Sequence, residues 1–370
     1  MSDDHHAITP VVSVVMPTYN GEKFLRPAIE SILNQTLVDF ELIIIDDAST
    51  DSTPRLLAEF KDDRLRLFTN DCNLGIAGAT NKGLAVARGQ YVALQDHDDV
   101  SLPHRLQTQV DYLAAHPKIA LVGSAATKID ERGAVLGTVL EPGGALDLKW
   151  ELLFGCRFRH MTLMARRSAI LEIGGYRQNA SFRFATDYDM LSRAAMRYGV
   201  ANLTEPLVLW RRHGGATSIE HEQEQNRAAE TISFRHLCEL GEMAASGCGL
   251  RQKPAETEEL YRAYLGLRAF ILTPPRQFPT LPPEQVISGL KYLCEIRETF
   301  YRVYSFPRSA VTKHRRALNW TWGKHAAALA IRAPWDWRSR AQILFAGIRC
   351  LQSALLADFW SSGVKAEKQR

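Results

Sequence analysis

The sequence predicts an α/β fold in which a mainly parallel sheet is flanked by helices and followed by a mainly helical C-terminal region. Up to about residue 125, short β-branched apolar runs alternate with helix-like segments, which is the pattern of βαβ units. The apolar runs are uniform rather than alternating, as in strands that are covered on both faces. Past about residue 219 the strand pattern fades and helical periodicity replaces it.

The strands and helices of the first part can be assigned in order. The expected strands are Val11–Met16, Leu42–Ile45, Leu65–Phe68, Tyr91–Leu94 and Ile119–Val122. The expected helices between them are Glu22–Leu33, Thr53–Phe60, Ile76–Ala87 and His104–Ala115. Ser52 and Thr53 can cap the second helix, and Pro54 stands in its first turn, where a proline is tolerated. Pro103 is expected to begin the fourth helix in the same way.

The middle of the chain, from about Gly123 to Ser218, is less regular. Further strands are expected at Ala125–Ile129 and Met161–Ala165, and further helices at Asp147–Phe154 and Asp187–Tyr198. The change to helical periodicity places a domain boundary near residue 220. We therefore expect an α/β domain over residues 1–220 and a helical region over residues 221–370.

Composition narrows the class of protein. The chain has 370 residues, of which 46% are hydrophobic and 23% charged, and a formal net charge of +4. These values are ordinary for a globular protein, and the weak basic balance argues against a dedicated nucleic-acid-binding protein. The six scattered cysteines form no CxxC pair and show no zinc spacing, which favours reduced thiols. Residues 1–10 show no signal-peptide pattern, and no apolar run of about 18 residues predicts a membrane-spanning helix. We therefore expect a cytoplasmic location.

The loops that follow the strands are the places to search for a ligand site, because ligands of parallel sheets bind beyond the carboxyl ends of the strands. The first strand leads into Pro17-Thr18-Tyr19-Asn20-Gly21. A proline, an aromatic ring and an amide at one strand end can frame a flat base. The alternative is a plain strand-to-helix turn, because Asn-Gly is a strong turn dipeptide. Both interpretations stay open for this loop taken alone.

The second strand ends in two adjacent carboxylates, Asp46 and Asp47. Charges at the end of a buried strand are costly unless a ligand or a helix N-terminus stabilises them. They can accept hydrogen bonds from a nucleobase or from ribose hydroxyls. Capping of the next helix is the alternative, but Ser49, Asp51 and Ser52 suffice for that.

Three carboxylates follow the fourth strand, at Asp96, Asp98 and Asp99. Without a cation they would repel one another. Hard oxygen ligands suit Mg²⁺ and Mn²⁺, and Mg²⁺ is commonly shared between carboxylates and substrate phosphates. His97 is expected to point away from such a site. The alternative is an exposed acidic turn that caps the helix after Pro103.

Two later segments carry further candidates. Asp187 stands at the start of an expected helix, where it serves either as a cap or as a general base for an acceptor hydroxyl. The segment Trp210-Arg211-Arg212-His213-Gly214-Gly215 suits contact with phosphate or completion of a metal site. A solvated basic loop is the alternative.

Taken together, these loops resemble family 2 of the inverting glycosyltransferases, which have the GT-A fold. The resemblance runs from about Val11 to Ser218. The matching segments are Val14–Asn20, Ile45–Asp51, Asn73–Ala77, Asn81–Gly83, Ala87–Tyr91 and Asp96–Asp99. Each is modest alone, but the set in this order and spacing is specific.

The resemblance implies a role for each matching residue. Pro17, Tyr19 and one of Asp46 or Asp47 would surround the nucleobase, and Asp96 would meet the ribose. Asp98 would hold a Mn²⁺ or Mg²⁺ ion on the donor diphosphate, with Asp99 and His213 as further metal ligands. Asp187 would be the base that deprotonates the acceptor. The other candidates for donor binding in the matching segments are Asn20, Asn73, Gly75 and Asn81.

The sequence departs from the family pattern at two positions. Thr80 stands where the family often has an arginine, which bears on donor choice and phosphate contact. Thr186 replaces the glutamate of the family's Glu-Asp pair, so that Asp187 lacks its neighbouring carboxylate.

The function implied is an inverting transfer of a sugar from a nucleoside-diphosphate sugar, with a UDP-sugar favoured, to a hydroxyl of a saccharide or lipid-linked acceptor. Synthesis of surface polysaccharide or glycolipid is the expected setting. One alternative is a nucleotidyltransferase that makes such donors, but the loop after the first strand lacks the glycine-rich, basic character that would cradle a triphosphate. The other is a sugar-nucleotide-binding protein with weak or lost catalysis, which Thr186 keeps open.

The C-terminal third carries no motif with assignable chemistry, but it turns basic and tryptophan-rich after residue 300. The basic residues are Arg302, Arg308, Lys313, Arg315, Arg316, Lys324, Arg332, Arg338 and Arg340, and the tryptophans are Trp320, Trp322, Trp335, Trp337 and Trp360. Amphipathic helices of this kind can lie on an anionic membrane surface, which would place the protein at the cytoplasmic face. A helical packing domain with a solvated basic face is an equal alternative.

Overall fold

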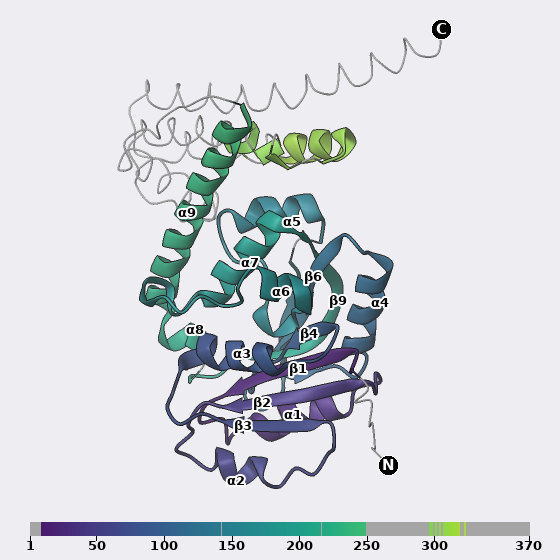
Figure 1. Cartoon of the computed structure of the whole chain (residues 1–370), viewed down its shortest axis with the longest axis vertical. Coiled ribbons are helices and arrows are strands. Elements are labelled where there is room, and N and C mark those ends of the chain that lie inside the picture. The colour runs from purple at the N-terminus through teal and green to yellow at the C-terminus, as the bar shows by residue number, and fades with distance from the viewer. Residues whose placement is uncertain are drawn as a thin grey trace, which may run out of the picture. The chain divides into compact units, whose positions relative to one another are not determined.

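The computed structural model describes residues 9–141, 143–215, 217–248, 296–298, 300–301, 303–304, 306–318 and 322 (Figure 1). The chain divides into two compact units, residues 1–233 and 234–370. The division falls inside the long helix α9 (Glu222–Cys248), whereas the expected boundary near residue 220 precedes that helix. The expected assignment of two domains stays a prediction.

The first unit is built on one nine-stranded sheet, counted over the described residues, in the order β3-β2-β1-β4-β8-β6-β9-β5, with β7 paired to β6. The strands are β1 (Val12–Thr18), β2 (Phe40–Asp46), β3 (Leu65–Thr69), β4 (Tyr91–Leu94), β5 (Val100–Ser101), β6 (Ile119–Ile129), β7 (Val135–Val139), β8 (Met164–Arg166) and β9 (Gly199–Arg211). Strands β3, β2, β1 and β4 are mutually parallel. The predicted α/β fold with a mainly parallel sheet is confirmed.

Helices cover both faces of this sheet. They are α1 (Leu25–Leu33), α2 (Thr53–Leu57), α3 (Gly75–Val86), α4 (Arg105–Ala115), α5 (Ala145–Leu152), α6 (Arg167–Glu172), α7 (Thr186–Arg197), α8 (Thr217–Glu220) and α9, with short 3-10 turns at His160–Thr162 and Ala180–Phe182. One apolar core joins the sheet to α3, α5, α6, α7 and the start of α9, and a second joins it to α1 and α4. This two-sided burial is the reason why the strands read as uniform apolar runs.

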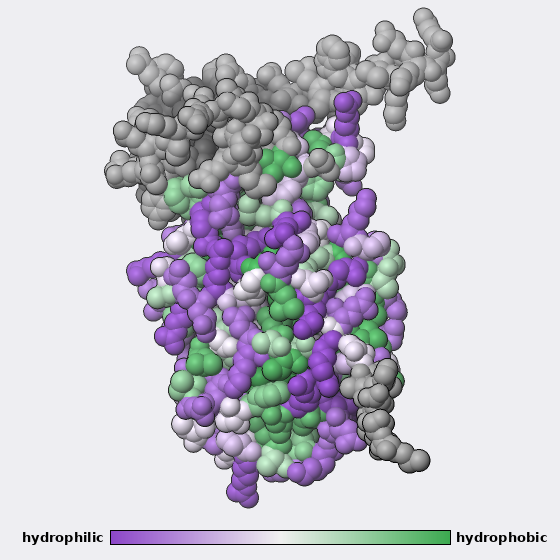
Figure 2. Space-filling view, in the orientation of Figure 1, coloured by the Kyte–Doolittle hydropathy of each residue, from purple (hydrophilic) through white to green (hydrophobic). Residues whose placement is uncertain are grey.

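Alternate residues of β1 show how the strands serve both cores. Val15 belongs to the core under α3, whereas Val14 and Met16 belong to the core under α1. Successive side chains of a strand point to opposite faces, so a strand in this position must be apolar at every residue. On the face seen in Figure 2, hydrophobic residues gather over α6, α3 and the neighbouring strands. Leu171, Ile76 and Leu67 are among the large apolar side chains exposed in these elements.

Several strands differ from expectation, and among them β5 and β7 were not expected. The expected strands Ile119–Val122 and Ala125–Ile129 are one continuous strand, β6, which pairs along its length with β9. Strand β9 was not expected, because Asn202, Glu205 and Pro206 interrupt its apolar pattern. The register of β6 with β9 shifts between Ser124 and Ala126. This local irregularity accommodates the residues that interrupt the apolar pattern of β9.

Within the described residues, no helix combines the length and the apolar character that a bilayer span requires. In the second unit the described residues from Arg308 to Leu318 are helical. Arg315 forms an ion pair with Glu298, and the guanidinium of Arg297 lies over the ring of Trp322. These basic side chains therefore take part in packing within that unit.

Candidate active site

The carboxyl ends of β1, β2 and β4 meet at one edge of the sheet, because the three strands are parallel neighbours. Thr18 and Asp46 are register partners at the ends of β1 and β2, and the backbone N–H of Asp47 donates to the carbonyl of Thr18. The backbone N–H of Gln95, just after β4, donates to the carbonyl of Val15. The predicted loops are thus brought together at this edge.

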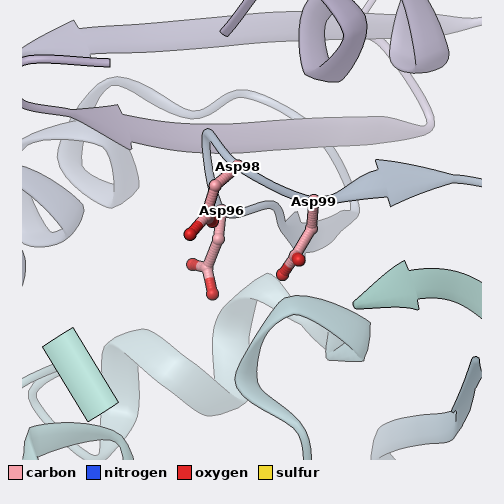
Figure 3. A group of neighbouring side chains, drawn as sticks. All are labelled: Asp96, Asp98 and Asp99. Atoms are coloured by element: carbon pink, nitrogen blue, oxygen red, sulfur yellow. The ribbon is translucent and has the colours of Figure 1, made fainter. Parts of the chain in front are cut away.

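Asp96, Asp98 and Asp99 form the acidic group of the site. One carboxylate oxygen from each lies within 4.8 Å of the others, and Figure 3 shows the three carboxylates turned toward the same space from one loop. Asp99 is buried, while Asp96 and Asp98 are partly exposed. Three convergent oxygen ligands of this kind are the donor set of a hard divalent cation.

The loop after β9, the last strand of the sheet in the sequence, contacts this acidic group. His213 Nε2 lies 2.8 Å from Oδ2 of Asp98. The backbone N–H of Arg211 donates to Oδ1 of Asp99 at 2.7 Å, and Nε of Arg211 donates to the carbonyl of Asp98. His213 and the acidic loop, which the sequence predicts as parts of one metal site, are therefore in direct contact.

The pKa values of Asp98 and Asp99 are shifted in opposite directions. Burial raises the pKa of Asp98, but the hydrogen bond from His213 and the charges of His97 and His213 outweigh it and hold the pKa below its ordinary value. For Asp99, burial and then the charges of Asp98 and Asp96 raise the pKa well above its ordinary value. A cation bound here would offset the repulsion from Asp98 and Asp96 that contributes to this rise in pKa. The ring of His97 lies beside Gly21, where a Cβ added to the glycine would be 3.0 Å from the ring; that His97 is no metal ligand stays a prediction.

Arg105 supports the acidic loop from beneath, a role that no local sequence pattern indicates. Its side chain is fully buried in α4. It donates to the carbonyl of Leu94 at 2.7 Å and to the side-chain oxygen of Gln95 at 2.9 Å. Burial lowers its pKa to about 10, so it stays charged at neutral pH. The two residues immediately before Asp96 are thereby fixed to a helix that lies under the loop.

Asp47 is engaged by the protein itself. Its carboxylate accepts hydrogen bonds from the side chain of Asn70 at 2.6 Å and from the backbone N–H groups of Leu74 at 2.9 Å and Gly75 at 2.8 Å. It thus sits at the N-terminus of α3, where the helix dipole stabilises a negative charge. Asp46 accepts one hydrogen bond from the backbone of Ser49 and keeps acceptor capacity, since a carboxylate has about four lone-pair positions. Of the two, Asp46 is the better candidate for a nucleobase or ribose contact.

Asn20 ties the first loop to the second. Its side-chain oxygen accepts from the backbone N–H of Thr50, and its own N–H donates to the hydroxyl of Ser49. Asn20 and Ala48 both have positive φ angles, of 50° and 61°, which are uncommon for residues other than glycine. Such strain is typical of functional loops. Tyr19, which precedes Asn20, is exposed, and Pro17 is the penultimate residue of β1.

Three other candidates for donor binding have structural contacts of their own. Gly75 has a φ of 74°, which favours glycine, and its N–H also donates to the side-chain oxygen of Asn73. Asn81 accepts from the backbone N–H of Tyr176 at 2.9 Å and donates to the carbonyl of the same residue at 2.7 Å. Roles of these residues in donor binding stay predictions.

The charge of Asp187 acts on a histidine that contacts Asp96. Asp187 lies in the first turn of α7 and is partly exposed, and its carboxylate accepts from the backbone N–H of Tyr188. Burial lowers the pKa of His160, but the charges of Asp96 and Asp187 and a hydrogen bond with Asp96 outweigh it and raise the pKa. For Tyr176, burial and then the charge of Asp187 raise the pKa well above its ordinary value. His160 in turn contacts Asp96, with Nδ1 at 3.2 Å from Oδ1. The predicted base and the predicted nucleoside contact therefore act on one shared histidine.

Neither His160 nor Tyr176 is among the site residues predicted from the sequence. The predicted carboxylates of the donor site follow strands, whereas His160 precedes strand β8. Because β8 runs antiparallel to β4, the start of β8 lies at the edge where β4 ends. A histidine just before an expected strand was the available signal, but only the strand direction gives it meaning.

Comparison with known proteins identifies the family of this chain. Residues 13–173 match the family described as Glycosyl transferase family 2. The chain is 40% identical over 191 residues to the putative glycosyltransferase EpsE of Bacillus subtilis, covering 50% of this chain and 66% of that protein. It is 32% identical over 243 residues to an uncharacterized glycosyltransferase of Haemophilus influenzae, covering 62% of this chain and 73% of that one.

A solved structure shares the fold. A crystal structure of S. aureus TarS in complex with UDP-GlcNAc superposes with a TM-score of 0.54 at 16% sequence identity, covering 92% of this chain and 90% of that one. The family match includes the ends of β1, β2 and β4 and the acidic loop. On these matches the chain belongs to glycosyltransferase family 2.

Proposed function

We propose that this protein is a metal-dependent, inverting glycosyltransferase that moves a sugar from a nucleoside-diphosphate sugar to an acceptor hydroxyl. The observation that carries the proposal is the convergence of Asp96, Asp98 and Asp99 within 4.8 Å, with His213 on Asp98, at the edge where β1, β2 and β4 end. A site of hard oxygen ligands beside strand-end loops suits a diphosphate bridged by a cation.

The residues present fit a divalent cation. Asp98 has a lowered pKa and so stays charged at neutral pH, and Asp99 and His213 flank it as further candidate ligands. A bound Mn²⁺ or Mg²⁺ would supply a Lewis acid to the departing diphosphate. The chain's own part is to hold these groups in place, which Arg105 does from beneath and Arg211 from the side.

The loops beside the acidic group suit the nucleoside. Tyr19 offers an exposed ring after β1, and Asp46 offers a carboxylate at the end of β2. Asp96 is the member of the acidic group that would meet the ribose. A UDP-sugar is the donor we expect, and the UDP-GlcNAc complex of TarS supports a donor of this class for the fold. The acceptor we expect is a saccharide or a lipid-linked saccharide of a surface polysaccharide or glycolipid.

Asp187 is the base in this proposal. It accepts the proton of the acceptor hydroxyl while that oxygen attacks the anomeric carbon on the face opposite the diphosphate, so the product has inverted configuration. The influence of its charge on His160, which contacts Asp96, supports a position next to the donor. Because residue 186 is a threonine, Asp187 lacks the preceding carboxylate of the family's Glu-Asp pair.

A donor panel tests the proposal directly. The full chain is incubated with UDP-, GDP-, dTDP- and CDP-sugars and Mn²⁺, with and without EDTA, and released nucleotide is measured. Release of a nucleoside diphosphate that EDTA abolishes supports the proposal. Pyrophosphate formation from a nucleoside triphosphate and a sugar phosphate would indicate a nucleotidyltransferase instead. Binding of a donor without turnover, in the presence of acceptor extracts, would indicate a sugar-nucleotide-binding protein.

Peripheral contact with the cytoplasmic face of a membrane belongs to the same proposal. Most of the basic, tryptophan-rich segment lies outside the described residues. Co-sedimentation with vesicles that contain anionic lipid, compared with neutral vesicles, tests this contact. Equal recovery with both would favour the packing role that the contacts of Arg315 and Arg297 support.

A further inference from the structure

The side chain of His160 bridges the acidic loop and the turn before the second 3-10 segment. Its Nδ1 lies 3.2 Å from Oδ1 of Asp96, and its Nε2 lies 2.9 Å from the hydroxyl of Tyr176. The two rings meet edge to face with centroids 5.7 Å apart. The imidazole is mostly buried and Tyr176 is buried, so solvent does not easily replace these contacts.

The direction of the first of these hydrogen bonds is fixed by chemistry. An ionised carboxylate only accepts hydrogen bonds, so Nδ1 of His160 must carry the proton that it shares with Asp96. This holds whether the imidazole is neutral or charged. The hydroxyl of Tyr176 can serve Nε2 either as donor or as acceptor. The hydrogen bond between Nε2 and Tyr176 can therefore run in either direction. The bond from Nδ1 to Asp96 is always donated by the ring and is charge-assisted.

Tyr176 gives the ring a fixed support. Both backbone polar groups of Tyr176 are held by the side chain of Asn81 in α3. The preceding residue, Gly175, has a φ of 61°, and a Cβ there would lie 2.6 Å from the side-chain oxygen of Asn81. The N-terminus of α3 is in turn held by Asp47 at the end of β2. His160 is thus braced against the core of the sheet rather than against a free loop.

Asp96 needs such a partner. It stands within 4.8 Å of two other carboxylates, and its side chain is 36% exposed, so repulsion would turn it toward solvent. We infer that His160 is a positioning residue for the donor, which by donating from Nδ1 to Oδ1 of Asp96 holds that carboxylate with its other oxygen left for the sugar nucleotide. This inference rests on the proposed function.

Two substitutions separate this role from simple packing. In an asparagine the amide nitrogen comes nearest to the place of the histidine Nδ1, whereas in a glutamine it comes nearest to the place of Nε2. His160→Asn can therefore still donate to Asp96, and His160→Gln can contact Tyr176 but not hold Asp96. The readouts are the Kd of UDP in the presence of Mn²⁺, measured by calorimetry, the KM of the donor, kcat, and the melting temperature of each variant.

We expect His160→Gln to weaken UDP binding and to raise the KM of the donor by about ten-fold or more, as the loss of a hydrogen bond to a charged group predicts. For His160→Asn, the Kd of UDP and the KM of the donor should stay within about three-fold of the wild-type values. A change of this size is small compared with the loss of a hydrogen bond to a charged group. The same His160→Gln change made in an Asp96→Ala background should have little further effect, because the partner is already absent.

Three results would overturn the inference. One is UDP binding by His160→Gln equal to that of the wild-type chain. Another is an equal loss in both variants that follows their melting temperatures, which is the mark of a packing role. The third is full additivity in the Asp96→Ala background. If His160→Gln does not fold, His160→Ala takes its place in the same comparison. If the wild-type chain binds none of the nucleoside diphosphates, the proposed function falls and this inference falls with it.

Discussion

His213 Nε2 and Asp98 Oδ2 lie 2.8 Å apart although 115 residues separate them in the chain. The contact arises because β9, which ends at Arg211, returns alongside β6 and pairs with the short strand β5 that follows the acidic loop. The loop after β9 is thereby brought into contact with the acidic group. It also helps to keep the carboxyl of Asp98 ionised, since its pKa is held below the ordinary value.

The first prediction concerns Asp98. Asp98→Asn should lower metal-dependent turnover by at least about a hundred-fold, because a neutral amide is a poor ligand for a hard cation, while its oxygen can still accept from His213. Turnover is measured as nucleoside diphosphate released over a Mn²⁺ titration. Asp111→Asn, the same change at an exposed site on α4, is the matched control. Full activity of Asp98→Asn in EDTA would remove the metal from the mechanism.

The second prediction separates two aspartates of α7. Asp187→Asn should reduce kcat by about a hundred-fold to ten-thousand-fold, the usual worth of a general base, and leave UDP binding within about two-fold, well below the worth of one hydrogen bond. Asp189 is fully buried and pairs with Arg193 at 2.8 Å. Asp189→Asn should instead lower the melting temperature, because it leaves a buried guanidinium without its charge partner.

Kinetics and melting curves of the two variants decide this second prediction together. If Asp187→Asn turned over at the wild-type rate, Asp187 would not be the base. If it lost activity and stability in the proportion that Asp189→Asn does, its role would be structural.

The parallel part of the site could be predicted because its positions follow from local patterns. The apolar runs of β1, β2 and β4 identify buried strands, and the carboxyl ends of parallel neighbours must share an edge. This places Asp46 near Asp96 without any knowledge of side-chain contacts. His213 was associated with the metal site by its residue type and its resemblance to a family segment, and the contact with Asp98 agrees with that association.

The parts that were not predicted depend on contacts between distant segments. Asp47 looked free because the helix that follows it has caps of its own, yet it holds the N-terminus of α3, 28 residues further on. His160 gains its place from the antiparallel direction of β8, and Arg105 gains its role from being buried under Gln95. A local sequence pattern predicts neither the direction of a strand nor the burial of a single arginine.

The third prediction tests the close packing that aligns β1 with β4. A Cβ at Gly89 would lie 2.5 Å from the backbone nitrogen of Ser13 and 2.8 Å from the carbonyl oxygen of Tyr91. Because these are backbone atoms of paired strands, they cannot move aside. Gly89→Ala should destabilise the protein by roughly 3 kcal/mol, as overpacking does. At Gly155 a Cβ meets no atom within 4 Å, so Gly155→Ala should stay within about 0.5 kcal/mol. Equal melting temperatures for both variants would contradict the packing described.

The fourth prediction concerns pH and a buried carboxylate beneath the same strands. Burial raises the pKa of Glu41, but hydrogen bonds from Ser13, Arg66 and Arg88 outweigh it and lower the pKa below its ordinary value of 4.5. Ser13 donates to it at 2.6 Å and Arg66 at 2.6 Å. A carboxyl whose folded-state pKa is lowered stabilises the fold at pH values above its unfolded pKa, and that stabilisation is lost as the pH falls through the folded-state value.

Glu41→Gln should therefore lower the melting temperature at pH 7 by about 5 °C, which corresponds to about 2 kcal/mol for a unit of this size. The difference from the wild-type chain should shrink as the pH is taken below 4.5, because the wild-type carboxyl then takes up a proton and becomes neutral as well. Glu59→Gln is the matched control, since Glu59 is exposed and pairs with Arg26 at the surface, where an ion pair is worth about 0–1 kcal/mol. A Glu41→Gln difference that stayed constant from pH 7 down to acid pH would show that shape and packing, rather than the charge of Glu41, hold β1, β2 and β3 together at this point.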